Sequence, residues 1–267
     1  PALPGVVFDG EFFRIGVSTS YALKRSRTEN ITLSLAADAS YEDQDISLAG
    51  LTAPLFADRT RAVRASITGT QLLRSGELGY DAQLSRGIAA LGARTRDDAS
   101  PLRPLSRDGA DADFTRLAGG VNFSQNLAGG LQLRAGLRGQ TSFNAPLLRS
   151  EQTSILAPGL ISAPPGGLVT GDRMIAGRLE LQTRYSPNEN LAVQPFVAFA
   201  AGESRLERPT ALERTHSAAY GPSAGVRASF GTPAGPAFSA QVEWTRLNSN
   251  DQRLSRDWLG FTLALRY

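Results

Sequence analysis

The last nine residues of the chain carry the pattern that decides its fold. From Leu259 to Tyr267 the sequence reads Leu-Gly-Phe-Thr-Leu-Ala-Leu-Arg-Tyr, with a large apolar or aromatic residue at every second position. Because successive side chains of a β-strand point to opposite faces, this alternation predicts a strand with one apolar and one polar face. The stretch from Ile31 to Tyr41 has the same period of two.

Segments with this period recur along the whole chain, and several are ten residues or longer. A strand that crosses a membrane needs about 9–11 residues, whereas strands of soluble proteins usually have about 5–6. The sequence therefore predicts an all-β protein, a transmembrane antiparallel β-barrel that occupies residues 1–267. Its expected strands are 10–23, 29–46, 59–73, 76–91, 114–127, 131–147, 173–186, 191–204, 218–230, 238–248 and 258–267.

The composition of the 267 residues excludes several kinds of site. There is no cysteine and a single histidine, which excludes disulfides, thiolate zinc sites and multi-histidine metal sites. Lys24 is the only lysine among the 28 basic residues, and the arginines are scattered, which argues against binding to nucleic acid. The mean hydropathy of −0.19 is typical of a soluble protein, but a membrane barrel alternates polarity and has a similar value.

No residue pattern points to catalysis, a metal or a cofactor. His216 lies beside Ser217, but the nucleophile motif Gly-x-Ser-x-Gly is absent, so we interpret it as a solvated loop histidine. The carboxylates of Asp97, Asp98, Asp111 and Asp113 lack the spacing of a calcium loop. We predict that the protein is not an enzyme.

The polar faces of the predicted strands carry charges of both signs, which is typical of the water-filled lumen of a membrane barrel. A soluble barrel would alternate in the same way, so it remains an alternative. Aromatic residues gather near strand ends, which favours interfacial girdles over ordinary cross-strand packing. The candidate lumen-lining residues are Arg14, Asp38, Arg64, Asp81, Arg134, Arg138, Arg178, Glu180, Arg184, Arg227, Glu243 and Arg266.

Short and long connections alternate, which gives an orientation. The long ones are 47–58, 92–113, 148–172, 205–217 and 249–257. Because bacterial barrels have short periplasmic turns and long extracellular loops, we expect the C-terminus in the periplasm. Eleven strands is an odd number. Either residues 3–9 form a twelfth strand or, as we favour, further strands precede this sequence.

Two sets of residues resemble known proteins. Phe261, Leu263, Leu265 and Tyr267 look like the C-terminal signal that the bacterial outer-membrane assembly machinery reads. The order and spacing of a longer series resemble the barrel of two-partner secretion transporters, the hemolysin secretion/activation family within the outer-membrane insertase superfamily. That series comprises 16–23 with Arg25 and Asn30, 84–93, 111–117, 146–152, 171–173, 179–181 and 194–199 with Gly202.

This resemblance implies a bacterial outer-membrane barrel of 16 strands, of which this chain supplies the sixth to the sixteenth. It implies that loop 148–172 is extracellular or folds back into the lumen, and that the barrel exports a secreted partner protein. The implied partners are outer-membrane lipid, the assembly machinery and that protein.

The chain departs from the family at one loop. Family members carry Val-Arg-Gly-Tyr at the loop tip, and its arginine pairs with a strand aspartate. The alignment places Ser162 at the arginine position and Ala200 at the aspartate position, unless Arg149 or Arg173 takes that role. Both charges are absent together, which suggests one alternative to secretion, a non-secreting anchor or scaffold of a larger assembly. The size of the chain suggests another, an autotransporter-type translocator of 12 strands.

Overall fold

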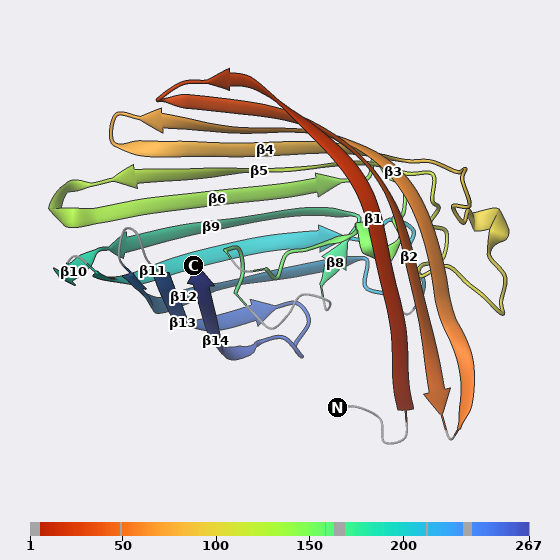
Figure 1. Cartoon of the computed structure of the whole chain (residues 1–267). Coiled ribbons are helices and arrows are strands. Elements are labelled where there is room, and N and C mark those ends of the chain that lie inside the picture. Colours follow the sequence, from red (N-terminus) through yellow and green to blue (C-terminus); the bar gives the residue numbers. More distant parts are fainter. Residues whose placement is uncertain are drawn as a thin grey trace.

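A computed structural model describes residues 6–48, 50–157, 159–162, 169–188, 190–211, 213–231 and 237–266. Its main element is one 12-stranded antiparallel sheet, which curls so that β1 and β14 form its two edges (Figure 1). The chain follows the order β1-β2-β3-β4-β5-β6-β9-β11-β12-β13-β14, with β10 paired to β11. Among the described residues, β1 pairs only with β2 and β14 only with β13.

The strands of this sheet are β1 (Val6–Arg25), β2 (Glu29–Leu48), β3 (Leu51–Leu73), β4 (Gly76–Gly87), β5 (Thr115–Asn126), β6 (Leu131–Thr141), β9 (Arg173–Thr183), β10 (Tyr185–Asn188), β11 (Leu191–Arg205), β12 (His216–Gly231), β13 (Ala237–Ser249) and β14 (Arg256–Arg266). A separate two-stranded hairpin joins β7 (Thr153–Ser154) to β8 (Thr170–Gly171). Three short 3₁₀ helices complete the described structure: η1 (Arg96–Asp98), η2 (Ala128–Gly130) and η3 (Arg149–Glu151).

Every predicted strand corresponds to a strand of the sheet, but several boundaries are wrong. The strand expected at 76–91 ends at Gly87, and the strand expected at 131–147 ends at Thr141. The expected outer loop 47–58 is a tight hairpin, because β2 continues to Leu48 and β3 begins at Leu51. Pro54 conceals this strand in the sequence; it lies opposite Asp45 where the register shifts, one of the few places a strand tolerates proline. The expected strand 173–186 is divided between β9 and β10.

A separate twelfth strand within residues 3–9 is wrong for the described part of that segment, because Val6 to Asp9 form the start of β1. Their partners Asp45 to Leu48 on β2 continue the same ladder without a break. Residues 3–5 lie outside the described part of the chain.

The outer face of the sheet is apolar and exposed. Val17 on β1 and Leu263 on β14 are 72% and 71% exposed, and similar residues cover the strands between them. An apolar surface this extensive is typical of contact with lipid. Together with the polar inner face, it confirms the predicted transmembrane β-barrel fold. None of the described helices has the length and apolar composition needed to span a membrane.

The aromatic residues that suggested girdles do not all lie near strand ends on the outer face. Phe13 and Tyr41 lie well inside β1 and β2, which begin at Val6 and end at Leu48, and Trp258 packs against the buried apolar cluster on the inner side. Phe13 and Tyr41 are direct partners on β1 and β2, and their ring centroids are 6.2 Å apart. Phe230 and Phe238 are direct partners at the opposite end of β12 and β13.

The largest buried apolar cluster lies on the inner side of the sheet rather than between layers. Ile155, Leu156, Leu160 and Ile161 come from the segment between β7 and β8. They pack against five side chains of the sheet: Met174, Ala176, Ala200, Ala219 and Leu247. Three of these are alanines, one each on β9, β11 and β12. Burying a large apolar side chain contributes about 1.5–3 kcal/mol, so this contact holds the segment firmly against the wall.

Candidate functional site: the inner loop and its two attachments

Loop 148–172 begins in a tightly packed region. Leu147 and Leu148 are fully buried, and η3 follows them directly. Asp172, which is also fully buried, fixes both ends of the loop: its Oδ1 accepts from the backbone N–H of Leu147 at 2.9 Å and from Nε2 of Gln152 at 3.0 Å. These two bonds hold the beginning and the end of the loop together. The residues between them extend along the inner wall of the sheet.

The first attachment is an ion cluster around Glu151, which is 1% exposed. Its carboxylate lies 2.6 Å from Nη2 of Arg64, 3.1 Å from Nη1 of Arg116 and 3.7 Å from Nη2 of Arg14. Asp38 joins two of these arginines, at 2.6 Å from Arg64 and 2.8 Å from Arg14. We call Glu151, Arg14, Asp38, Arg64 and Arg116 the base cluster. A carboxylate buried this deeply requires such partners, because an unpaired buried charge is costly.

The second attachment is at the loop tip and rests on neutral loop groups. Ser162 Oγ donates to Oε2 of Glu243 at 2.9 Å. Arg178 Nη1 donates to the carbonyl oxygen of Leu160 at 3.3 Å and to Oε1 of Glu243 at 2.8 Å. The other side of the Arg178 guanidinium pairs with Glu180 at 2.9 Å. The tip thus lies on charges that already pair with one another.

The wall beneath the tip is completed by an arginine on β12. Arg227 donates to both oxygens of Glu180, at 2.6 and 2.9 Å, and its guanidinium lies 4.1 Å from the centre of the Phe196 ring. Gly225 makes room for that ring, since a Cβ there would come within 2.5 Å of it. We call Arg178, Glu180, Arg227 and Glu243 the wall quartet.

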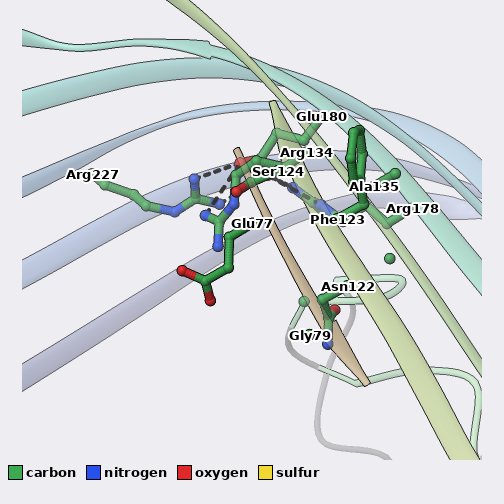
Figure 2. Close-up of a pocket in the computed structure, with 12 residues that line it drawn as sticks. Glu77, Gly79, Asn122, Phe123, Ser124, Arg134, Ala135, Arg178, Glu180 and Arg227 are labelled. Atoms are coloured by element: carbon green, nitrogen blue, oxygen red, sulfur yellow. Dashed lines mark hydrogen bonds and ion pairs between the residues drawn. The ribbon is translucent and has the colours of Figure 1, made fainter. Parts of the chain in front are cut away.

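Arg178, Glu180 and Arg227 of the wall quartet border a cavity of about 350 Å³, shown in Figure 2. Arg134 reaches toward it from β6 and lies 3.9 Å from Glu180, and its side chain is 51% exposed. Glu77, Asn122 and Ser124 supply further polar groups to the lining. The space is thus polar and open to water, with charges of both signs.

Ala200, which we predicted from the sequence to occupy the position of the family aspartate, lies directly opposite Arg178 in the β9–β11 ladder. Ala200 is 4% exposed and packs in the apolar cluster with Leu160 and Ile161. An apolar tip therefore occupies the space in front of Ala200, and the nearest arginine comes from the wall. Of the aligned tip, Ile161 and Ser162 are described; Ala163 and Pro164 lie outside the described residues.

The two arginines considered as substitutes for a tip arginine lie elsewhere. Arg149 lies over the Phe56 ring, 5.8 Å from its centre. Arg173 is at the start of β9, where it contacts Asn144 at 3.3 Å and Glu207 at 3.5 Å. Neither has a hydrogen bond or ion pair to the described tip residues.

The remaining candidate residues do not join these clusters. Asp81 and Arg138 form a separate pair at 2.9 Å, and Arg184 contacts Ser186 at 3.4 Å between β9 and β10. The side chain of Arg266 and all of Tyr267 lie outside the described part of the chain. The other three residues of the expected assembly signal are on β14 and are exposed: Phe261, Leu263 and Leu265.

Sequence reasoning missed the residues that connect loops. Glu151, Asp172 and Arg116 lay only within the ranges that carry the family resemblance, and no role was predicted for them or for Arg107. Arg107 is 4% exposed and pairs with Asp172 and, at 3.4 Å, with Glu213. Its loop is 65 residues before Asp172, so no local pattern could reveal the pair. The described residues hold no group of three or more potential metal ligands.

Comparison with known structures finds the same fold in larger proteins. CdiB from Escherichia coli matches with a TM-score of 0.72 and 15% identity over 97% of this chain and 45% of the other. CdiB from Acinetobacter baumannii matches with a TM-score of 0.67 and 14% identity over 97% and 42%. The chain therefore spans less than half the length of either structure. A search of curated protein sequences found no match.

The sequence profile described as "Haemolysin secretion/activation protein ShlB/FhaC/HecB" matches residues 6–228, most of the chain. That range includes β1 to β11, most of β12 and both loop attachments apart from Glu243. The chain belongs to the haemolysin secretion/activation family of outer-membrane transporters.

Proposed function

We propose that this chain forms the main part of the wall of an outer-membrane passage through which a secreted partner protein is exported. One observation carries the proposal: a family member keeps a loop inside its barrel, attached by a buried carboxylate and by its tip. A loop placed there obstructs the lumen at rest, and its displacement opens a polar path. Serine, glutamine and arginine side chains along that path offer weak contacts to a sliding polypeptide.

The proposed orientation places the C-terminus in the periplasm and the loop bases at the cell surface. Support comes from the short connections at one end of the strands, such as Arg74–Ser75 between β3 and β4. The loops at the other end include 88–114 and 142–172. We further propose that additional strands close the barrel, because β1 and β14 both leave an edge in this sheet, and an open edge in lipid costs several kcal/mol per unpaired group.

The experiment compares the proteins released by cells with and without this transporter. The export proposal predicts that one polypeptide disappears from the culture medium when the transporter is deleted and returns with the intact gene. It also predicts single-channel conductance of the purified protein in planar lipid bilayers. A protein that neither conducts nor changes the released proteins would exclude the passage.

A non-secreting anchor is the second candidate, because the tip arginine and the strand aspartate of the family are both absent. Restoring them in Ser162→Arg/Ala200→Asp distinguishes the two. An anchor would keep its partners and still export nothing, whereas gain of export only in the restored variant would mean that the natural chain has lost the activity.

A further inference from the structure

A row of three basic side chains crosses the outer face of the sheet, at the end of the strands where the long loops lie (Figure 1). Arg173 on β9 is the direct partner of Arg205 on β11, and Arg205 is the direct partner of His216 on β12. All three residues are exposed. Each lies an even number of residues from the exposed apolar side chains of its strand, and therefore on the outer face. Like charges directly opposite each other destabilise a sheet, so an anion bound at this row would stabilise it.

The two outer members of the row have acidic partners. Arg173 lies 3.5 Å from Glu207, and Nε2 of His216 lies 3.1 Å from Oε2 of Glu203. Arg205 makes no side-chain hydrogen bond or ion pair with any described residue, although a basic side chain lies on either side of it. The guanidinium in the middle of the row is therefore a positive group without a counter-charge in the described part of the chain.

An apolar groove of about 560 Å³ lies on the same face and extends from this row toward the middle of the strands. The surface is lowest where Gly177 lies directly opposite Ala201, because neither residue has a side chain beyond Cβ. Ala201 is four residues from Arg205 on the same strand, a distance of about 13 Å. Glu203, the partner of His216, borders the groove between them. The larger apolar side chains along the groove are exposed and come from four adjacent strands: Leu137, Ile175, Phe199 and Tyr220.

The groove and the basic row together have the chemistry that binds a lipid with an anionic head group. An apolar groove within a lipid-facing surface accommodates an acyl chain. A guanidinium at its end binds phosphate through charge-assisted hydrogen bonds. A soluble anion would account for the row alone, whereas a phosphate-bearing lipid accounts for both features.

We propose that the outer face of β9, β11 and β12 binds one lipid of the outer leaflet whose head group carries phosphate. The phosphate lies on Arg205, and an acyl chain lies in the groove along Gly177 and Ala201. The choice of leaflet rests on the orientation proposed above. The backbone N–H of Asp172 donates to the carbonyl oxygen of Arg205 at 3.0 Å, so the lipid binds at the strand position that holds the end of loop 148–172.

Native mass spectrometry of the purified full-length protein tests the site, with bisphosphorylated lipid A as the probe. The natural protein retains one lipid, and excess inorganic phosphate does not displace it. Arg205→Gln weakens binding about tenfold, because the charge-assisted hydrogen bonds to phosphate are lost. Ala201→Leu fills the groove and weakens binding to a similar extent, although all three basic side chains remain.

Arg86→Gln is the matched control. Arg86 is an exposed arginine on the outer face at the same end of the strands, but it is held by Asp113 at 2.5 Å and by Thr115 at 2.8 Å. Its substitution leaves the affinity for lipid A unchanged. Equal affinity of the natural protein and Arg205→Gln overturns the head-group contact. A loss in Arg205→Gln but not in Ala201→Leu, or displacement by inorganic phosphate, indicates an anion site only and overturns the lipid.

A cysteine in the neighbouring loop tests the leaflet separately. Residues 206–215 connect Arg205 to His216, and the chain has no natural cysteine. In intact cells, a membrane-impermeant thiol reagent labels Thr210→Cys when the row faces the cell surface. Absence of labelling overturns the outer leaflet while lipid binding stands. Binding is measured without export, so the lipid site and the passage can fail independently.

Discussion

The base and the tip of loop 148–172 are held on the sheet by different kinds of contact. At the base, a buried glutamate enters a group of three arginines from three different strands. At the tip, a serine and a carbonyl group contact arginine and glutamate side chains that neutralise each other. The base therefore depends on a charge that the loop supplies, whereas the tip depends on neutral loop groups and on the apolar packing of Leu160 and Ile161.

The largest expected effect follows loss of the base carboxylate. Glu151→Leu leaves Arg14, Arg64 and Arg116 with Asp38 as the one carboxylate of the base cluster and lowers the free energy of unfolding by about 3–5 kcal/mol. Removing Arg64 as well, in Arg64→Met/Glu151→Leu, recovers part of this loss because less uncompensated charge remains. Urea titration followed by heat-modifiable gel mobility measures the stability of Glu151→Leu, Arg64→Met and the double variant. If the double variant loses at least as much stability as the two single variants together, the ion pair is contradicted.

An intermediate effect is expected from the wall that supports the tip. In Gly225→Ala the new Cβ would lie 2.4 Å from the carbonyl oxygen of Val242 and 2.5 Å from the Phe196 ring, which forces the ring from its place between the wall arginines. Overpacking of this kind costs about 1–3 kcal/mol. Thermal unfolding measures it against Gly260→Ala, whose nearest contact at 3.9 Å is ordinary, and equal stability of the two variants would reject the tight fit.

The smallest effect on stability is expected at the tip itself. Ser162→Ala loses the hydrogen bond that the hydroxyl donates to the Glu243 carboxylate and costs about 1.5 kcal/mol, the lower end for a bond to a charged group. Its effect on opening is easier to see, because brief openings in planar bilayers become about tenfold more frequent. Ser229→Ala, on the β12 wall, is the control and leaves their frequency at the natural value. Unchanged opening in Ser162→Ala would remove the tip from gating.

The period of two predicted the strands because each strand has one lipid-facing side and one polar side. This pattern is local, so about ten consecutive residues of a strand are enough to show it. It failed at residues 47–58, where Pro54 interrupts the alternation inside a strand. The loop contacts were beyond its reach. Glu151 and Arg64 are 87 residues apart, and a glutamate in a polar loop has the same appearance whether it is solvated or buried.

The tip shows a subtler limit. The resemblance implies that Ser162 and Ala200 replace two charges, and we interpreted that replacement as a reason to consider a non-secreting anchor. It does not indicate that Leu160 and Ile161 pack on Ala200, or that Arg178 lies directly opposite Ala200 and meets the tip from the wall. Which residues fill a vacated position depends on neighbours across the sheet, and these come from distant strands.

The absence of cysteine gives the most direct test of a movable tip in this passage. Ser162→Cys and Glu243→Cys place two thiols where Oγ and Oε2 are now 2.9 Å apart, within reach of a short, reducible bifunctional reagent. We predict that linking the pair suppresses conductance in planar bilayers and that a reductant restores it. Conductance that is the same before linking, after linking and after reduction would contradict a tip that must leave the wall to open the passage.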